Sequence, residues 1–507
     1  MDEPKCLTVS SDISENGDKD EGSNVQKVGF EIGGYTVLPD VTKTKVEKVK
    51  RKLPAWLESP DVVESDIANK QKPLDSVSFI SDRIRAQLKH NQITHLFPVQ
   101  WQVIPEILSS VIPNSLMSKL GLPPRDICCS APTGSGKTLA FSLPVIQLLE
   151  TCNTRRLRAL VVLPVSDLAL QVYKVFQDYS EGTSLKVALT NGQLSLAEEQ
   201  KMLTTRNDVT EELETAVDIL VTTPGRLVDH ISFTQGFDLT QLRFLILDEV
   251  DKILEEVKHD WLDYLERAVY DKRGWPQPIT AASLNSAALP LQKLLFSATL
   301  TQNPEKLEKL RLCEPRLFTS VISKEQSMDV DHSDDHFTGK YTTPQGLQEY
   351  YIECRVPNKQ TPSTPISVTY TKTEESTCVC WISGHSSEVS GDISKKRRTQ
   401  IIRQFSRSHI DVIITTDLMA RGLDVDDVST VVSYDSPPYI KTYIHRVGRT
   451  ARAGKPGQAY TILNAKEVSY FRKMIKSSSK SVKARKVGRS ELAPYVERCK
   501  QILSAKE

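Results

Sequence analysis

The chain has 507 residues, which is enough for roughly three or four domains of ordinary size or for two larger lobes with tails. Charged residues make up 25% and hydrophobic residues 39% of the chain, as is typical of a soluble globular protein. The nine cysteines contain no Cys-x-x-Cys pair, which argues against a disulfide framework and a structural zinc site. There is no apolar signal segment and no apolar run of about 18 residues, so neither secretion nor a membrane location is expected.

Charge is distributed unevenly, although the net charge is only +1. Residues 1–40 hold nine acidic and three basic side chains, and residues 41–52 hold six basic and one acidic. This region has few large apolar side chains to offset the entropy of ordering, so residues 1–75 are predicted to be a mostly disordered extension. Residues 470–490 hold eight basic side chains and no acidic ones. We predict a basic C-terminal extension over 476–507, either as a solvated tail or as a contact to nucleic acid.

Short apolar runs that end in polar residues begin near residue 75. Such runs are typical of strands buried on both faces, and the amphipathic segments between them predict a parallel α/β sheet. The expected strands are 126–130, 159–164, 218–223, 244–248 and 294–297, followed by a second series at 412–417 and 431–435. Helices are expected at 138–149 and 167–179. We therefore predict an α/β fold of two parallel-sheet lobes, over 76–323 and 347–475, joined by an acidic linker over 324–346.

A glycine-rich string lies between a predicted buried strand and a predicted helix: Ala131-Pro132-Thr133-Gly134-Ser135-Gly136-Lys137-Thr138. Glycines allow backbone N–H groups to surround phosphate oxygens, and the helix start adds partial positive charge. In this pattern Lys137 reaches the β- and γ-phosphates and Thr138 holds Mg²⁺. Ala131 stands where the generic pattern has glycine. The strand-to-helix context nevertheless predicts an ATP-phosphate site rather than a turn without function.

An acidic string, Asp248-Glu249-Val250-Asp251, ends the predicted strand 244–248. Downstream of a phosphate loop, an acid at the end of a buried strand can hold Mg²⁺ through water, and a neighbouring Glu can position the attacking water. We therefore predict catalytic roles for Lys137, Asp248 and Glu249. Thr138 and Asp248 are the predicted magnesium ligands, partly through water.

Further motifs follow in the order found in one known family. They are Phe97-Pro98-Val99-Gln100, Thr223-Pro224-Gly225-Arg226, Ser297-Ala298-Thr299, Thr415-Thr416-Asp417, Ala420-Arg421-Gly422-Leu423-Asp424 and His445-Arg446-Val447-Gly448-Arg449-Thr450-Ala451-Arg452. Together with the phosphate loop and the acidic string, they resemble the DEAD-box RNA helicases of superfamily 2 over residues 75–475. The resemblance implies two RecA-like lobes and an RNA-stimulated ATPase that melts RNA duplexes locally.

The resemblance also implies roles for individual residues. Gln100 would read adenine, Asp424 would bind the ATP ribose, and Arg449 and Arg452 would be arginine fingers. The implied coupling residues are Asp251, Ser297, Thr299 and His445, and the implied RNA-binding residues are Thr223, Gly225, Arg226, Arg398 and Thr416. Because the arginine fingers and the phosphate loop lie in different lobes, hydrolysis would require closure of the lobes, which RNA lying across both would favour. Contacts to the RNA backbone imply little sequence specificity.

The chain also departs from the family. Motif Ia reads Pro164-Val165-Ser166-Asp167 where the family has Pro-Thr-Arg-Glu, so a hydroxyl and a cation are lost, and of the family's double glycine only Gly192 is present. An insert at 109–124 and the segment 93–100 resemble the nucleolar subgroup that acts in large ribosomal subunit assembly. This finer resemblance implies precursor ribosomal RNA and pre-ribosomal proteins as partners, and a nuclear, nucleolar location. The alternative is a catalytically weakened relative that acts as an RNA-binding assembly factor.

The beginning of the second lobe is short. Between Gln360 and Arg398 there are only about 37 residues, and their prolines, excess of Ser and Thr, and missing helical period argue against a helix. A short strand is expected at 378–382, motif IV is not recognisable, and Lys395 replaces the Gln of the usual Gln-x-x-Arg. We therefore predict that this region is truncated, that sheet surface around 412–414 is uncovered, and that the second lobe is weakened.

Overall fold

The structure is a computed structural model of the whole chain. It describes residues 30–32, 35–37, 54–64, 70–110, 124–207, 211–256, 261–273, 291–300, 304–320, 343–344, 346–354, 368–371, 386–389, 393–417, 428–476 and 482–487. Within the first 52 residues, β1 (Phe30–Ile32) and β2 (Tyr35–Val37) pair as an antiparallel hairpin, where the sequence predicts mostly disorder. In the described part of the chain, no helix is long and apolar enough to span a membrane.

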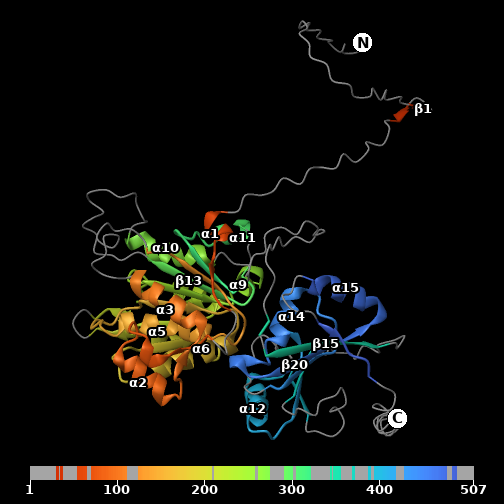
Figure 1. The fold of residues 1–507 in the computed structure, drawn as a ribbon. Helices are drawn as coiled ribbons and strands as arrows, with labels where there is room; N and C mark the ends of the chain where they lie inside the picture. The colour runs from red at the N-terminus through yellow and green to blue at the C-terminus, as the bar shows by residue number, and fades with distance from the viewer. Residues whose placement is uncertain are drawn as a thin grey trace, which may run out of the picture. The chain divides into compact units, whose positions relative to one another are not determined.

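The first lobe is built on an eight-stranded sheet in which every pair of neighbouring strands is parallel (Figure 1). Its strand order is β3-β14-β6-β13-β12-β7-β11-β8. The strands are β3 (Asp61–Val62), β6 (Ile127–Ser130), β7 (Ala159–Val162), β8 (Val187–Thr190), β11 (Ile219–Thr222), β12 (Phe244–Asp248), β13 (Gln292–Ser297) and β14 (Arg316–Thr319). All five strands predicted for this lobe are present.

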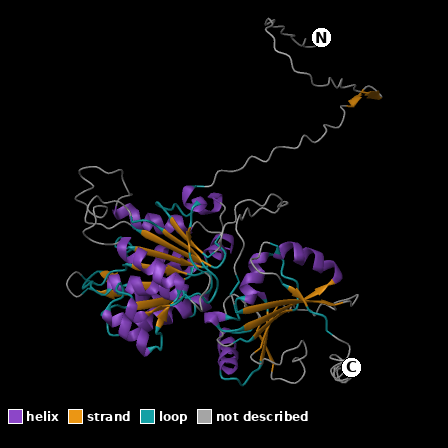
Figure 2. Ribbon diagram, viewed as in Figure 1, coloured by secondary structure: helices purple, strands orange, loops and turns teal. Residues whose placement is uncertain are grey.

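The sheet is covered on both faces, because alternate residues of each strand point to opposite sides. In β12, Phe244 and Ile246 join one core cluster and Leu245 and Leu247 join the other. The first cluster is completed by helices α2 (Asp82–His90), α3 (Pro98–Ser110), α5 (Lys137–Leu149) and α6 (Ser166–Ser180). The second is completed by α1 (Ala55–Glu58), α7 (Leu196–Leu203), α8 (Pro224–Phe233), α9 (Val250–Glu256), α10 (Trp261–Arg273) and α11 (Pro304–Glu308). The result is the three-layer α/β arrangement in Figure 2.

The first lobe begins earlier than the predicted boundary at residue 76. Strand β3 pairs with β14, Asp61 accepts a hydrogen bond of 2.6 Å from Nε of Arg316, and Leu57 of α1 is buried in the core. Residues 54–64 therefore belong to the folded lobe and not to the extension. Their partner strand lies some 255 positions away, and a pattern search along the chain does not reveal such long-range pairing.

The second lobe contains a seven-stranded sheet in the order β17-β18-β16-β19-β20-β15-β21. Its strands are β15 (Leu347–Cys354), β16 (Val368–Thr371), β17 (Ser386–Val389), β18 (Val412–Thr415), β19 (Thr430–Ser433), β20 (Gly457–Asn464) and β21 (Lys483–Ala484). Its helices are α12 (Lys395–Ser406), α14 (Ile440–Val447) and α15 (Ala465–Ile475), with a 3-10 turn at Arg452–Gly454. Because β21 pairs with β15, this sheet reaches past the predicted end of the lobe at residue 475.

The shortened region forms strands that the sequence did not predict. Strand β16 lies between β18 and β19 and is antiparallel to both, whereas the other pairs in this sheet are parallel. The strand expected at 378–382 lies outside the described residues. The predicted uncovered surface around 412–414 is wrong for Val412 and Ile413, which are 2% and 0% exposed, although Ile414 is half-buried. Pairing with β16 and packing of Ile413 with residues of α12 account for this burial.

Candidate nucleotide and RNA site

The phosphate loop joins β6 to α5 at the carboxyl edge of the first sheet. Gly134 and Gly136 have φ angles of 77° and 83°, a left-handed conformation that is strained for residues other than glycine. A Cβ on Gly136 would also clash with Nε2 of Gln100. The ammonium of Lys137 donates to the carbonyls of Ala131 and Pro132 at 2.8 and 3.1 Å. The backbone therefore holds this cation beside the loop.

Gln100 of α3 is tied to the same loop. Its side chain is 2% exposed, its Oε1 accepts from the N–H of Phe97 at 2.8 Å, and its Nε2 donates to the carbonyl of Gly136 at 3.2 Å. Both ends of the amide are thus bonded to the backbone. This geometry places Gln100 where it supports the phosphate loop, and its reading of adenine stays a prediction.

Two adjacent carboxylates at the end of β12 have opposite electrostatic environments. Burial, followed by the nearby charge of Glu249, raises the pKa of Asp248 to about 7. Burial alone would also raise the pKa of Glu249, but the positive charges of His445, Lys137 and Arg449 outweigh it and hold that pKa below its ordinary value. Glu249 therefore stays ionised, as a residue that positions an attacking water must.

Glu249 also occupies an unusual backbone conformation. Its φ of 53° is in the left-handed region, which costs a residue with a side chain free energy and is found most often at functional sites. Its N–H donates to Oδ1 of Asp248 at 3.0 Å. A cavity of about 20 Å³ lies beside its side chain, also lined by Asp251, Thr299 and His445. That volume is enough for one water molecule.

Asp251 receives hydrogen bonds from both hydroxyls of the Ser-Ala-Thr string. Ser297 Oγ and Thr299 Oγ1 donate to its Oδ2 at 2.9 and 2.8 Å, the contact that the family resemblance implies. Thr299 Oγ1 is also 3.5 Å from Nε2 of His445, whose Nδ1 is 4.0 Å from Oε2 of Glu249. These side chains form a buried polar chain from the first sheet to α14.

The arginine-rich segment after α14 lies against the phosphate loop. Thr133 Oγ1 donates to the carbonyl of Gly448 at 3.0 Å, and a Cβ on Gly448 would clash with Thr133. A Cβ on Gly134 would lie 3.1 Å from Cα of Arg452. Arg449 is 6% exposed and its Nε donates to the carbonyl of His445 at 3.3 Å. Both predicted arginine fingers are therefore next to the phosphate loop and the carboxylates.

The predicted RNA-binding residues fall into three places. Thr223 and Gly225 lie at the start of α8 with Arg226, and Gly225 is exposed. Arg398 of α12 donates from Nη1 to Oδ2 of Asp167, on α6, at 3.0 Å. The remaining two residues are Thr416, half-buried just after β18, and the predicted ribose contact Asp424, which lies outside the described residues.

Several polar contacts at this edge have no signal in the sequence. Arg446 is 2% exposed and forms a two-pronged pair with Asp417, at 2.5 and 2.6 Å. Asp167, which stands at a departure from the family pattern, accepts the bond from Arg398. Motif strings contain these residues or lie beside them, but only the tertiary structure shows which charges meet.

The residues present fit a nucleotide triphosphate with Mg²⁺. Ser135 Oγ is buried in the phosphate loop and, in the described part of the chain, has no hydrogen-bond partner, so it is available to a phosphate oxygen. Asp248 is 8% exposed, and its raised pKa shows that protein cations do not fully compensate its charge. A carboxylate and a hydroxyl (Thr138) are ligands that Mg²⁺ accepts.

Residues 97–307 match the DEAD/DEAH box helicase family, and residues 352–454 match the helicase conserved C-terminal domain. The chain is 42% identical over 501 residues to the ATP-dependent RNA helicase DDX51 of Danio rerio, covering 93% of this chain and 75% of that protein. It is 40% identical over 518 residues to DDX51 of Mus musculus, with coverage of 97% and 81%. It is 30% identical over 526 residues to the ATP-dependent RNA helicase dbp6 of Schizosaccharomyces pombe, with coverage of 94% and 83%.

Solved structures share the fold. Mss116p bound to single-stranded RNA and AMP-PNP is 20% identical, covers 87% of this chain and 85% of that one, and has a TM-score of 0.59. Dbp5 of S. cerevisiae bound to RNA and ADP BeF3 is 19% identical, covers 85% and 100%, and has a TM-score of 0.56. At these identities the likeness establishes two RecA-like lobes.

Proposed function

Since the chain belongs to the DEAD-box family of ATP-dependent RNA helicases, we propose that its two lobes close on ATP and RNA to form one hydrolytic site. The observation that carries this proposal is the contact between Thr133 of the phosphate loop and Gly448 of the arginine-rich segment. It brings residues 315 positions apart within hydrogen-bond distance. A second-lobe arginine can then stabilise charge on a phosphoryl group bound in the first lobe.

Each residue of the site has a distinct role in this mechanism. Lys137 and the phosphate loop bind the β- and γ-phosphates, and Arg449 and Arg452 stabilise the charge that develops on the transferred group. Glu249, held ionised by the surrounding cations, orients the attacking water and accepts its proton. Thr138 and Asp248 would hold Mg²⁺. The ion would supply neutralisation of phosphate charge when bound.

The polar chain Asp251–Thr299–His445 provides a route by which RNA and nucleotide binding affect each other. It joins α9 and the segment just after β13, both of the first lobe, to α14 of the second. Any change in the distance between the lobes alters the Thr299–His445 contact. Because His445 acts electrostatically on Glu249, the same change alters the electrostatic environment of Glu249. Backbone contacts at Thr223, Gly225 and Thr416 would favour the closed arrangement when a single strand lies across both lobes.

The RNA target is proposed to be precursor ribosomal RNA in the nucleolus, bound together with pre-ribosomal proteins. Two features support this: the family resemblance of the segments around 93–124, and the basic side chains that follow α15. Described members of that basic stretch include Lys483, Arg485 and Lys486. Cationic side chains attract structured RNA without reading its sequence. Crosslinking of the chain to RNA in cells, with sequencing of the bound fragments, tests this; fragments spread over messenger RNA alone would contradict it.

The activity itself is tested by ATP turnover of the purified chain with and without RNA. We expect stimulation by RNA, and we expect Glu249→Gln to bind ATP and RNA but to block hydrolysis and trap a closed complex. Glu308→Gln, the same change at an exposed glutamate that ends α11 of the first lobe, should leave turnover close to that of the unmodified chain. Hydrolysis that survives Glu249→Gln would exclude the water-positioning role. A chain that binds both ligands without any turnover would instead support the non-enzymatic alternative, which the relatives' names do not favour.

A further inference from the structure

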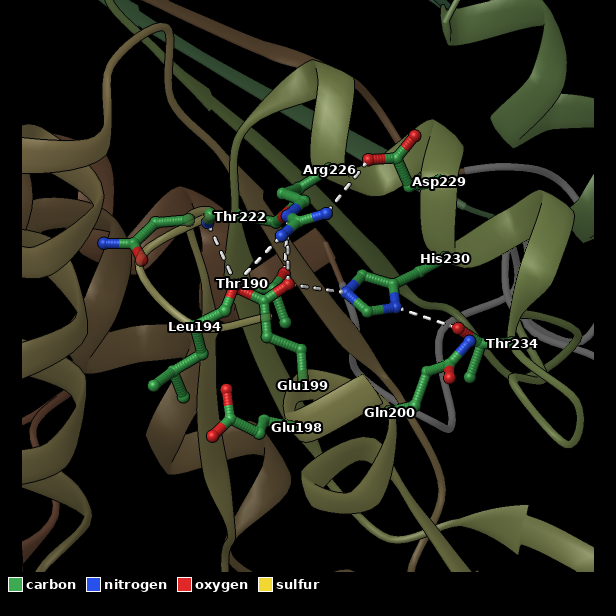
Figure 3. Close-up of polar contacts among 12 residues, drawn as sticks. Thr190, Leu194, Glu198, Glu199, Gln200, Thr222, Arg226, Asp229, His230 and Thr234 are labelled. Atoms are coloured by element: carbon green, nitrogen blue, oxygen red, sulfur yellow. Dashed lines mark hydrogen bonds and ion pairs between the residues drawn. The ribbon is translucent and has the colours of Figure 1, made fainter. Parts of the chain in front are cut away.

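Another buried carboxylate, apart from those of the nucleotide site, lies at the carboxyl edge of the first sheet, on α7. Glu199 is 1% exposed. Helix α7 begins with a capping box in which Ser195 and Glu198 bond each other's backbone N–H groups. This cap sets the rotation of the helix, so that Glu198 faces solvent and the next residue, Glu199, points into the protein (Figure 3). A carboxylate buried this deeply is costly unless donors surround it.

Three donors from two separate elements meet at Glu199, and Figure 3 shows Arg226 and His230 directed at its carboxylate. The N–H of Gly192 donates to Oε1 at 3.1 Å. Arg226 Nε and His230 Nε2 are each 3.1 Å from Oε2. Gly192 belongs to the loop after β8, and the other two belong to α8. The carboxylate therefore joins the 191–194 loop to the helix that begins at the Thr-Pro-Gly-Arg motif.

The protonation of His230 follows from its partners. The carboxylate of Glu199 can only accept, so Nε2 of the neutral ring carries the hydrogen, and Nδ1 accepts from the hydroxyl of Thr234 at 2.9 Å. Burial lowers the pKa of His230, although Glu199 opposes this. The ring is 0% exposed. His230 thus acts as a fixed hydrogen-bond donor that holds Oε2 of Glu199 in place.

Arg226 is held by protein groups at each of its three nitrogens. Besides Nε on Glu199, its Nη1 is 3.3 Å from Asp229 Oδ2 and its Nη2 donates to the carbonyl of Leu194 at 3.0 Å. A guanidinium held in this way is fixed in orientation. Arg226 itself belongs to α8. Its bond to the carbonyl of Leu194 therefore ties the 191–194 loop to α8 a second time.

We propose that Glu199, braced by His230, is a positioning residue for RNA, and that Arg226 acts through the protein backbone rather than as a phosphate ligand. The cluster sets the distance between the 191–194 loop and the exposed backbone at Gly225. The RNA backbone is then bound by groups that this cluster holds in place. The inference deepens the RNA contact proposed above and rests on it.

The first test uses two buried glutamates of the same lobe. Glu266 is 2% exposed and, like Glu199, is hydrogen-bonded by donors on both oxygens: Lys293 at 2.8 Å and Arg311 at 2.5 Å. It lies near the amino edge of the sheet, because Lys293 is the second residue of β13. Glu199→Gln and Glu266→Gln therefore remove the same charge from two equally buried, hydrogen-bonded positions at opposite edges of the sheet.

We expect Glu199→Gln to raise the RNA concentration for half-maximal ATPase stimulation by at least about tenfold, since a charged hydrogen-bond set is broken. Its kcat at saturating oligouridine should stay within about twofold of the unmodified chain. Glu266→Gln should leave the half-maximal RNA concentration unchanged, whatever it does to the melting temperature. Equal RNA defects in both variants would mean loss of stability alone, and no RNA defect in Glu199→Gln would also overturn the proposal.

Variants of His230 and Arg226 decide the case if Glu199→Gln does not fold. His230→Gln keeps a donor for Glu199 and should bind RNA normally, whereas His230→Leu should reproduce the RNA defect. Arg226→Gln should weaken binding of labelled oligouridine while leaving the slope of log Kd against log salt unchanged. A slope reduced by about 0.7 would show a lost phosphate contact and overturn the assignment. If the unmodified chain shows no RNA stimulation, the proposed function fails and not the role of this cluster.

Discussion

The two lobes of the chain supply different groups to the site, and their described residues are packed differently. The first lobe supplies the acidic groups of the site, Asp248, Glu249 and Asp251, on a sheet whose two faces are both covered by helices. The second supplies His445, Arg449 and Arg452, beside a sheet that contains one antiparallel strand, and the described residues of this lobe pack in three smaller clusters. In the proposed mechanism, therefore, neither lobe alone contains a complete hydrolytic site.

Removing the first lobe's own cation should have the largest effect. In Lys137→Ala the phosphates lose the ammonium that the loop holds in place, and we expect ATP turnover to fall to background while the fold survives. ATPase assays and circular dichroism of the purified variant measure the two parts of this prediction. Ordinary turnover in this variant would show that the nucleotide binds elsewhere.

Removing a second-lobe cation should give a smaller but still large loss. Arg452→Ala and Arg449→Ala should each lower kcat by about 10³-fold, the usual contribution of an arginine finger, with nucleotide binding to the first lobe retained. A fluorescent ATP analogue measures that binding. Lys455→Ala, a basic residue just beyond the segment, is the matched control. If these variants lost nucleotide affinity but kept their kcat, the arginines would act in nucleotide binding and not in catalysis.

The difference in packing predicts a moderate effect on stability. The second lobe should melt at a lower temperature than a version of it with a full-length family segment restored between β15 and α12, and the chain should have lower RNA-stimulated ATPase than the correspondingly restored chain. Scanning calorimetry of residues 340–507, alone and with the restored segment, tests the first statement. Equal cooperativity in both, together with equal ATPase of the corresponding full chains, would refute the prediction of a weakened lobe.

The smallest effect concerns the pH dependence of the first lobe. Burial raises the pKa of Asp248 from 3.8 to about 7 in the folded chain, so the folded state binds the proton more tightly than the unfolded state. The free energy of unfolding should therefore fall as pH rises from about 4 to about 7, by at most about 1.4 kcal/mol per pH unit, and level off above. Asp248→Asn should lack this component. Denaturant unfolding of both chains at several pH values, without nucleotide, measures it; identical slopes would place the titration elsewhere.

Much of the first lobe could be predicted from the sequence, because its signals are local. The apolar runs that became β6, β7, β11, β12 and β13 needed no knowledge of their neighbours, since strands buried on both faces must be continuously apolar. The phosphate loop is equally local: Gly134 and Gly136 are required by the backbone conformation of one short turn. The pairing of Asp251 with Ser297 and Thr299 followed from the family resemblance and is present in the structure.

What only the tertiary structure decided involves residues far apart in the chain. The pairing of β3 with β14, the place of β16 inside the second sheet and the burial of Glu199 against Arg226 and His230 have no periodic or local signature. The partner of a strand and the counter-ion of a buried charge depend on which segments come into contact when the chain folds. By itself, the sequence determined the two α/β lobes and the nucleotide-binding motif. The contacts that hold Arg226 and Arg398 were decided by packing between distant segments, and the roles of these two residues in RNA binding stay predictions.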